Sequence, residues 1–273
     1  MKPYIKAFLF LVVVMTLDYL FRKGIVPIPL PLPQRLSFLI LFGLFTLFTL
    51  LATKRFAKSD GLTLNDLGIS AKSANRRDFL VGCLVGIAIW GLVSIIQSIA
   101  AGFDWVLRSD ISVYNLIYGF VFIFVADLGT ELYARGYPLT KLKESFGANA
   151  AIVIMVFFFA LISFSFNYEG ELLMYVILIP TLHTIFFSII YFKSGRLGAG
   201  VGVHTGANFV TNSIFDLRES QESQAIPSGI FEANVPLDDL SLTALQMPYV
   251  VIAILFSIVC YFWWKKSQAR PAT

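Results

Sequence analysis

The chain has 273 residues, of which 57% are hydrophobic and 14% charged, and its mean hydropathy is +0.77. Soluble domains carry about 25% charged residues, so this composition excludes a soluble globular protein. The net charge of +4 and the sequence pI of about 9.0 occur without the aromatic or groove-reading context of a nucleic-acid surface, so we expect no nucleic-acid partner.

Several apolar stretches approach the ~20 residues that a helix needs to cross the hydrocarbon core of a membrane. They predict an all-α, polytopic membrane protein with about eight transmembrane helices. The first stretch follows Lys2 and Lys6 as a signal peptide would, but it lacks a small-residue cleavage site and runs on into Asp18 and Arg22. We therefore interpret it as a membrane anchor. The expected spans are 4–21, 36–52, 79–100, 113–132, 149–167, 172–192, 197–214 and 248–264.

The Lys and Arg residues divide unevenly between the two sides that eight spans would create. Sixteen of the 21 lie on the side of both termini and of the loops after the second, fourth and sixth spans, with Arg135 among them. The positive-inside rule therefore predicts that both termini are cytoplasmic. The other side carries Arg22, Lys23, Arg35, Arg108 and Arg218.

No internal repeat or linker marks a domain boundary, so we divide the chain by its membrane organisation. Residues 1–78 form an N-terminal two-helix membrane region with a basic cytoplasmic loop, and 79–214 form an intramembrane core. Residues 215–247 form an acidic external loop, and 248–273 form the last transmembrane helix and a cytoplasmic tail.

Three loop segments have distinct expectations. We expect the basic loop 53–78 to be a solvated surface beside anionic headgroups. The alternation of proline and aliphatic residues in 25–33 predicts an extended segment. The long segment 215–247 is either a partner-binding cap or a solvated loop.

Two side-chain types have simple interpretations. Cys83 and Cys260 fall in apolar spans, so we expect buried thiols and no disulfide framework. Trp263 and Trp264, followed by Lys265 and Lys266, predict an interfacial anchor at the cytoplasmic end of the last span.

Three ionisable residues follow one another at four-residue steps in the fourth span and its continuation. Asp127, Glu131 and Arg135 would share one face of a helix. Such groups are costly in a bilayer and usually mark a site. A structural ion pair between Glu131 and Arg135 explains them equally well.

The segment 195–212, GRLGAGVGVHTGANFVTN, carries two rows of residues on one expected helix. Gly198, Gly202 and Gly206 form a groove where another helix can approach closely. Gly200, His204 and Asn208 form a second row on another side, about 200° away. An imidazole and a carboxamide stacked on one face, with a glycine beneath them, favour a site over a packing histidine. The sequence therefore predicts that this helix packs on one side and presents polar groups on the other.

Two further polar residues lie in apolar spans. Ser163 is unremarkable alone, because a membrane serine usually bonds to the carbonyl four residues earlier. We interpret His183 as a packing or hydrogen-bonding histidine. The chain has two histidines and no HExxH pattern, so we expect no metal site and no cofactor.

The order and spacing of these residues resemble the CPBP family of intramembrane proteases, which includes CAAX prenyl-protein endopeptidases and bacteriocin-processing or self-immunity (Abi) proteins. The resemblance covers about residues 80–215 and implies a bundle of that family's type. The family's third motif, His, three residues, then Asn, is matched fully by His204 and Asn208. Its second motif, Phe, three residues, then His, is matched at Phe159 but has Ser163 in place of the histidine.

The family's first motif is a Glu pair, three residues, then Arg and usually Gly. Here Thr130 replaces the first Glu, whereas Glu131, Arg135 and Gly136 match. The resemblance implies that the first Glu and the motif-two His activate water, while the motif-three His and Asn position the substrate and stabilise the oxyanion. The residues that remain, Glu131, Arg135, His204 and Asn208, therefore have scaffold and oxyanion roles, and Thr130 and Ser163 mark a degenerate site.

Two uncharged hydroxyls cannot act as the base and acid of peptide hydrolysis unless another group activates them. We therefore expect a pseudoprotease that binds a membrane segment or a partner protein as a scaffold, regulator or immunity factor in a bacterial cytoplasmic membrane, with membrane lipids around it. The alternative is an active intramembrane endopeptidase that uses Glu131, or Asp127, with His204, so the sequence leaves open whether the chain is an enzyme. A small-molecule transporter is less favoured, because no repeat symmetry is present.

Overall fold

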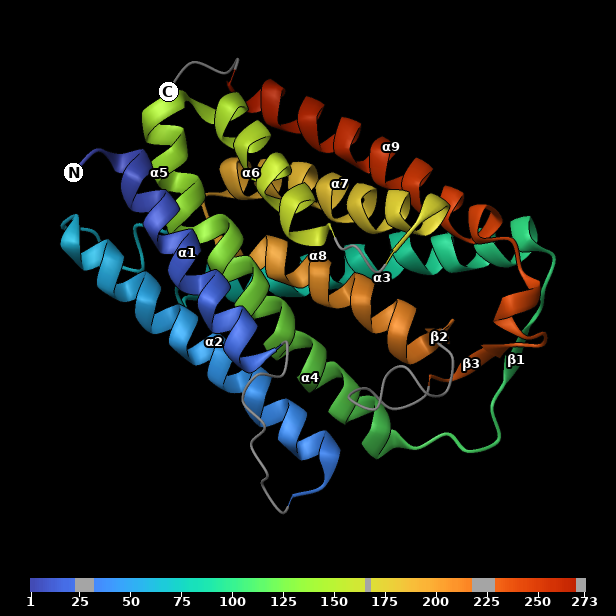
Figure 1. The fold of residues 1–273 in the computed structure, drawn as a ribbon. Helices are drawn as coiled ribbons and strands as arrows, with labels where there is room; N and C mark the ends of the chain where they lie inside the picture. The colour runs from blue at the N-terminus through green and yellow to red at the C-terminus, as the bar shows by residue number, and fades with distance from the viewer. Residues whose placement is uncertain (23–31, 165–167, 218–228, 269–273) are drawn as a thin grey trace.

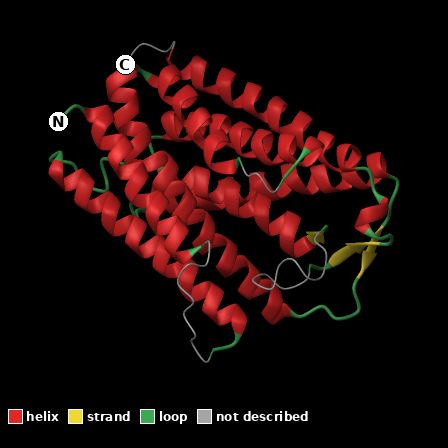
Figure 2. Ribbon diagram, viewed as in Figure 1, coloured by secondary structure: helices red, strands yellow, loops and turns green. Residues whose placement is uncertain are grey.

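Helices account for most of the structure, as the long apolar stretches predict. The computed structural model describes residues 1–22, 32–164, 168–217 and 229–268, and Figure 2 shows a helical bundle with a small sheet at one end. The α-helices are α1 (Pro3–Phe21), α2 (Gln34–Ser59), α3 (Ser73–Ala101), α4 (Val113–Glu131), α5 (Tyr137–Phe146), α6 (Ala148–Ser163), α7 (Gly170–Ser194), α8 (Leu197–Phe209) and α9 (Leu242–Gln268). The shorter elements are the π-helices η1 (Leu132–Gly136) and η2 (Val210–Ile214), the 3₁₀ helix η3 (Leu237–Asp239), and the strands β1 (Trp105–Leu107), β2 (Phe215–Asp216) and β3 (Phe231–Ala233).

Six of the eight expected spans correspond to helices that are long and apolar enough to cross a membrane within the described ranges. One of the six is the continuous run of α4, η1 and α5, which has 34 residues. The other two expected spans correspond to shorter helices, α6 with 16 residues and α8 with 13, which η2 continues. The predicted all-α membrane bundle is confirmed.

The helix ends sort into two groups in Figure 1. The start of α1 and the ends of α2, α5 and α9 lie toward one end of the bundle, and the three strands lie toward the other. This arrangement is the one that an even number of crossings requires. The assignment of the first end to the cytoplasm stays a prediction from charge.

Two cations counted in that prediction are not free loop residues. Arg135 lies in η1 and is 2% exposed, and Arg22 caps α1, where it pairs with Asp18 at 3.1 Å. Without them the split is 15 to 4, so the predicted orientation is unchanged.

Close contact between α3 and α8 forms the tightest seam of the bundle. A Cβ at Gly198, Gly202 or Gly206 would collide with the backbone of α3, and a Cβ at Gly82 or Gly86 of α3 would collide with that of α8. Small residues on both helices therefore let the two backbones approach. The predicted glycine groove of 195–212 is confirmed, and it fixes the orientation of the other face of α8.

The basic loop 53–78 is more ordered than a solvated surface. Leu67 is fully buried, and its carbonyl accepts a hydrogen bond from the hydroxyl of Tyr191 at 3.0 Å. Asn75 bonds the Gly68 carbonyl at 3.0 Å and the Gly198 N–H at 2.7 Å. The expectation of a mainly solvated loop is therefore wrong for residues 67–70 and for Asn75, because the N–H groups at the start of α8 take their partners from this loop.

At the opposite end, the strands pair in the order β1-β3-β2. Arg108, just after β1, forms ion pairs with Asp110 and with Glu232 of β3.

The last helix begins at Leu242, earlier than the expected residue 248, and includes Pro248. Of the segments that carried separate expectations, 25–31 and 218–228 lie outside the described residues. Cys83 and Cys260 are buried free thiols, as predicted.

Candidate functional site

The first part of the candidate site lies where α4 passes into η1. Glu131 ends α4 and is fully buried, and its Oε1 lies 3.2 Å from Nη1 of Arg135. π-Helical turns inside α-helices are often found at functional sites, because they change the direction of the side chains that follow. Gly129 leaves no room for a Cβ beside Phe45 and Thr46, so α2 packs directly behind this turn.

Helix α8 supplies the second part. His204 Nδ1 lies 2.9 Å from Glu131 Oε1, and Asn208 donates a hydrogen bond of 2.8 Å to Asp127 Oδ1. The Nε2 of His204 lies 3.5 Å from the same Asp127 oxygen. A Cβ at Gly200 would lie 3.2 Å from Glu131 Oε2, so the glycine gives the carboxylate room, as predicted. One imidazole therefore lies between two carboxylates.

Aromatic rings enclose this network. The guanidinium of Arg135 lies over the rings of Phe159, at 5.3 Å, and Phe187, at 5.1 Å. Phe187 also stacks on His204, with ring centroids 4.8 Å apart. Such rings favour a cation and exclude water. Phe159, the residue that matches the second motif, therefore packs against Arg135 and helps to enclose it.

The structure brings together Asp127, Glu131, Arg135, His204 and Asn208. Each of these side chains is at most partly exposed, and four described ion pairs or hydrogen bonds join them into one chain of contacts. Three of their buried atoms, Asp127 Oδ2, Glu131 Oε2 and Arg135 Nε, have no hydrogen-bond partner among the described residues.

Thr130 and Ser163 face a different part of the bundle. The hydroxyl of Thr130 donates to the Ala126 carbonyl at 3.1 Å and accepts a 3.4 Å hydrogen bond from Arg22 of α1. Arg22 and Ser163 line a cavity of about 330 Å³ between α1, η1, α6 and the middle of α7. Asp18, Tyr133 and Phe159 also line this cavity. Ser163 therefore lines this cavity and Thr130 bonds Arg22 of its lining, while the residues that match the family motifs form the network beside it.

His183 has the role expected of a hydrogen-bonding histidine. Its Nε2 lies 2.6 Å from the hydroxyl of Tyr249 in α9, and its carbonyl accepts from Arg135 at 3.4 Å. Its ring also packs edge-on against Trp90 and Phe186. The interpretation as a packing residue is confirmed.

Some site residues were not predicted. The contact of Asp127 with Asn208 and the contact of Arg22 with Thr130 need the packing of α1, α4 and α8, which no local pattern specifies. A signal for the second contact was present, since Asp18 and Arg22 are ionisable residues four apart at the end of an apolar span.

The two hydroxyl positions bring no ionisable group to the site. Peptide hydrolysis needs one group to take a proton from water and one to return a proton to the leaving nitrogen. Glu131 is bonded to Arg135 and His204, and neither Thr130 nor Ser163 has an ionisable side chain. Among the described residues, no three His, Cys, Asp or Glu side chains are grouped to hold a metal ion. The absence of a metal site stays a prediction.

Residues 111–210 match the model of a protease family, described as type II CAAX prenyl endopeptidase Rce1-like. The match covers α4 to α8 and so includes all three motifs. It confirms the resemblance to the CPBP family predicted from the sequence, in a chain whose described residues include six helices long and apolar enough to cross a membrane. No curated protein matches the chain.

Proposed function

We propose that this chain is a CPBP-family pseudoprotease that binds a membrane-embedded peptide segment without hydrolysing it. One observation carries the proposal: both water-activating positions hold hydroxyl residues, Thr130 and Ser163, while the residues that match the motifs are bonded to one another. Losing a general base costs about two to four orders of magnitude in rate. Losing both members of a coupled pair leaves little beyond binding.

The surviving residues support a structural role. The family resemblance gives Asn208 the role of stabilising the oxyanion, but its amide N–H donates a hydrogen bond to Asp127. Nδ1 of His204 lies within hydrogen-bond distance of Glu131. An oxyanion donor must be free to meet the developing charge. These donors are occupied by carboxylates of α4. Their contribution is therefore to hold α8 against α4 beside the cavity.

The cavity at the degenerate positions is the binding site in this proposal. Asp18 and Arg22 give its lining a negative and a positive group, and Ser163 adds a hydroxyl, whereas Phe159 and Ile162 are apolar. A membrane helix that carries a polar residue would find both partners for it there. The occupant is a transmembrane segment of a partner in a bacterial cytoplasmic membrane, and the chain acts on it as a scaffold, regulator or immunity factor.

Site-specific photocrosslinking in native membranes tests this function. A photoreactive amino acid at Ile162, which lines the cavity, should capture a membrane protein or peptide of intact length. The same amino acid at Phe157, which is 71% exposed on the same helix, should not capture it. Arg22→Gln should weaken the capture several-fold and Glu131→Gln should not. A captured chain that is cut, or equal capture from both positions, contradicts the proposal.

A second candidate function has one observation in its favour. Asp127 Oδ2 and Glu131 Oε2 are buried carboxylate oxygens without a hydrogen-bond partner in the described part of the chain. Either could accept a proton from water if the network opened, with His204 as the acid. In that case Asp127→Asn or Glu131→Gln should abolish cleavage of a membrane peptide by the purified protein.

A further inference from the structure

A second and larger cavity borders α8 on a different face from the candidate site. It has a volume of about 830 Å³ and is lined by side chains of α3, α7, α8 and α9. That volume is within the roughly 300–1,000 Å³ of sites that hold small molecules. Val203 lines this cavity and the next residue, His204, points to the network, so the helix separates the two sites.

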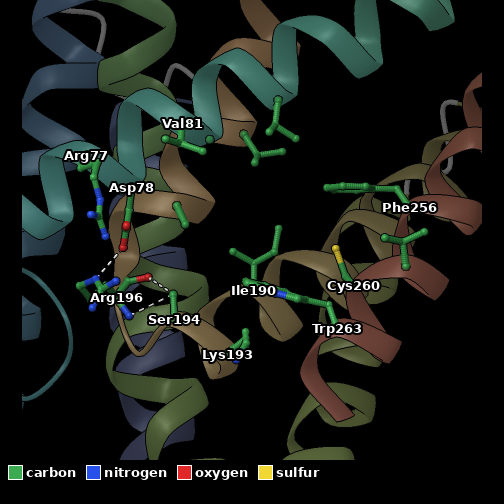
Figure 3. A pocket seen from close by; sticks show the side chains of 15 residues that line it. Arg77, Asp78, Val81, Ile190, Lys193, Ser194, Arg196, Phe256, Cys260 and Trp263 are labelled. Carbon is green, nitrogen blue, oxygen red and sulfur yellow. Dashed lines mark hydrogen bonds and ion pairs between the residues drawn. The ribbon is translucent and has the colours of Figure 1, made fainter. Parts of the chain in front are cut away.

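The wall of this cavity is mainly aliphatic and aromatic. Figure 3 shows Phe256, Cys260 and Trp263 of α9 on one side and Val81 of α3 on the other, with Ile190 of α7 between them. Val81 is 55% exposed and Trp263 is 49% exposed. In a bilayer, exposed apolar residues on membrane-spanning helices meet lipid chains, so the cavity opens sideways toward the hydrocarbon.

One end of the cavity is cationic. Arg77, Lys193 and Arg196 line it together with a single carboxylate, Asp78, which pairs with Arg196 at 2.5 Å. Lys193 lies 5.3 Å from the ring of Trp263, so its ammonium is held at the edge of the apolar wall. Three cations and one anion leave this end with a net charge of +2.

The position of this end matches the headgroup region. It lies near the start of α3 and the ends of α7 and α9, the end of the bundle that carries the excess of Lys and Arg. Anionic lipids attract basic residues at the cytoplasmic surface, and basic pockets between membrane helices bind their headgroups. An aliphatic groove with a cationic mouth at this level is complementary to a lipid that has apolar chains and an anionic headgroup.

We propose that this cavity is a binding site for an anionic phospholipid. One acyl chain lies along Val81, Ile190 and Phe256, and the phosphate lies between Arg77 and Lys193, the two cations of the mouth that have no carboxylate partner among the described residues. Ser194 bonds the backbone of Arg196 at 2.8 Å and fixes the turn that carries this edge of the mouth. The lipid fills the space between α3, α7 and α9 at this end of the bundle and contacts all three helices.

Native mass spectrometry of the delipidated full-length protein tests the site. The probes are phosphatidylglycerol and phosphatidylcholine with the same acyl chains, added at equal concentration. Each cation near the surface contributes about 1 kcal/mol to the attraction, which is about fivefold in binding. Arg77→Gln with Lys193→Gln should therefore lower the preference for phosphatidylglycerol by at least about tenfold.

A matched control separates a site from general attraction. Arg76→Gln with Lys265→Gln removes the same charge from exposed residues that do not line the cavity, and it should leave the preference unchanged. Cys260→Phe fills the apolar wall and should reduce the binding of both lipids, with the melting temperature of the lipid-free protein as the check on folding. Equal binding of the two lipids by the native chain, or equal loss in the two double variants, overturns the proposal.

Discussion

Asp127 and Glu131 hold the imidazole of His204 between them, and Asn208 and Arg135 contact the same two carboxylate oxygens as the imidazole does. All of these groups lie within the bundle, where an uncompensated charge is costly. At the scale of single residues, the network therefore acts as a polar connection between α4 and α8.

Removal of the cation of this network should destabilise the protein. Arg135→Leu leaves the Glu131 carboxylate buried with His204 alone, and breaking a buried pair in this way costs about 3–5 kcal/mol. Thermal unfolding in detergent should show a clear fall in melting temperature. Arg76→Leu, at an exposed position, is the control, and similar melting temperatures for the two variants would show that the pair contributes nothing.

The two hydroxyl positions allow a gain-of-function prediction. Thr130→Glu with Ser163→His should produce cleavage of a membrane peptide at least 10² times above the native chain, which is the lower end of what positioned acid-base groups contribute. Arg22, which now bonds Thr130, would keep the new carboxylate ionised. A double variant that folds and remains inactive would show that more than these two side chains has been lost.

At the scale of elements, the α3–α8 seam sets the geometry of the site. Because Gly198, Gly202 and Gly206 lie against the backbone of α3, the opposite face of α8 is pressed toward α4. The positions of His204 and Asn208 therefore depend on residues that do not contact the site.

A single methyl group in this seam should separate the helices. Gly202→Ala places a Cβ against the backbone of α3 near Phe79, and such overpacking costs about 1–3 kcal/mol. Gly43→Ala, in α2, meets nothing within 4 Å and should be neutral or stabilise by up to about 1 kcal/mol. Melting temperatures of the two variants compare the two positions directly. Equal values would contradict the close approach of α3 and α8.

The glycine rows of α8 and the shared face of Asp127, Glu131 and Arg135 were predictable, because periodicity within one helix is a local property. The partner of Asn208 was not, because it depends on how α4 meets α8 across 81 residues of chain. The start of α9 at Leu242 was missed since Pro248 indicates a helix start, yet proline is tolerated where neighbouring groups satisfy the backbone.

At the scale of the whole molecule, Asp60 joins three helices at the predicted cytoplasmic end. Its carboxylate pairs with Lys6 of α1 and with Lys141 of α5 and accepts a 2.9 Å hydrogen bond from the hydroxyl of Tyr137. Burial opposes ionisation of this group, but hydrogen bonds from Lys6, Lys141 and Tyr137 hold the pKa of the Asp60 carboxyl below its ordinary value.

This lowered pKa gives a pH dependence with a definite sign. The folded protein holds the Asp60 proton less tightly than the unfolded chain does, so the contribution to stability is complete above the unfolded pKa of about 3.9. It is lost as the pH falls through the lower folded pKa. Asp60→Asn should therefore unfold more readily than the native chain at pH 7 and show a shallower decline below about pH 4. Parallel melting curves between pH 3 and pH 7 would contradict this role.

The central claim is that the molecule binds a membrane segment and does not cut it. Its most direct test is incubation of the purified, folded protein with a library of transmembrane peptides, with every product identified by mass spectrometry. We expect intact peptides throughout, including those that remain bound to the protein. Cleavage at a defined peptide bond that disappears in Asp127→Asn or Glu131→Gln would contradict the account and establish the chain as an active protease.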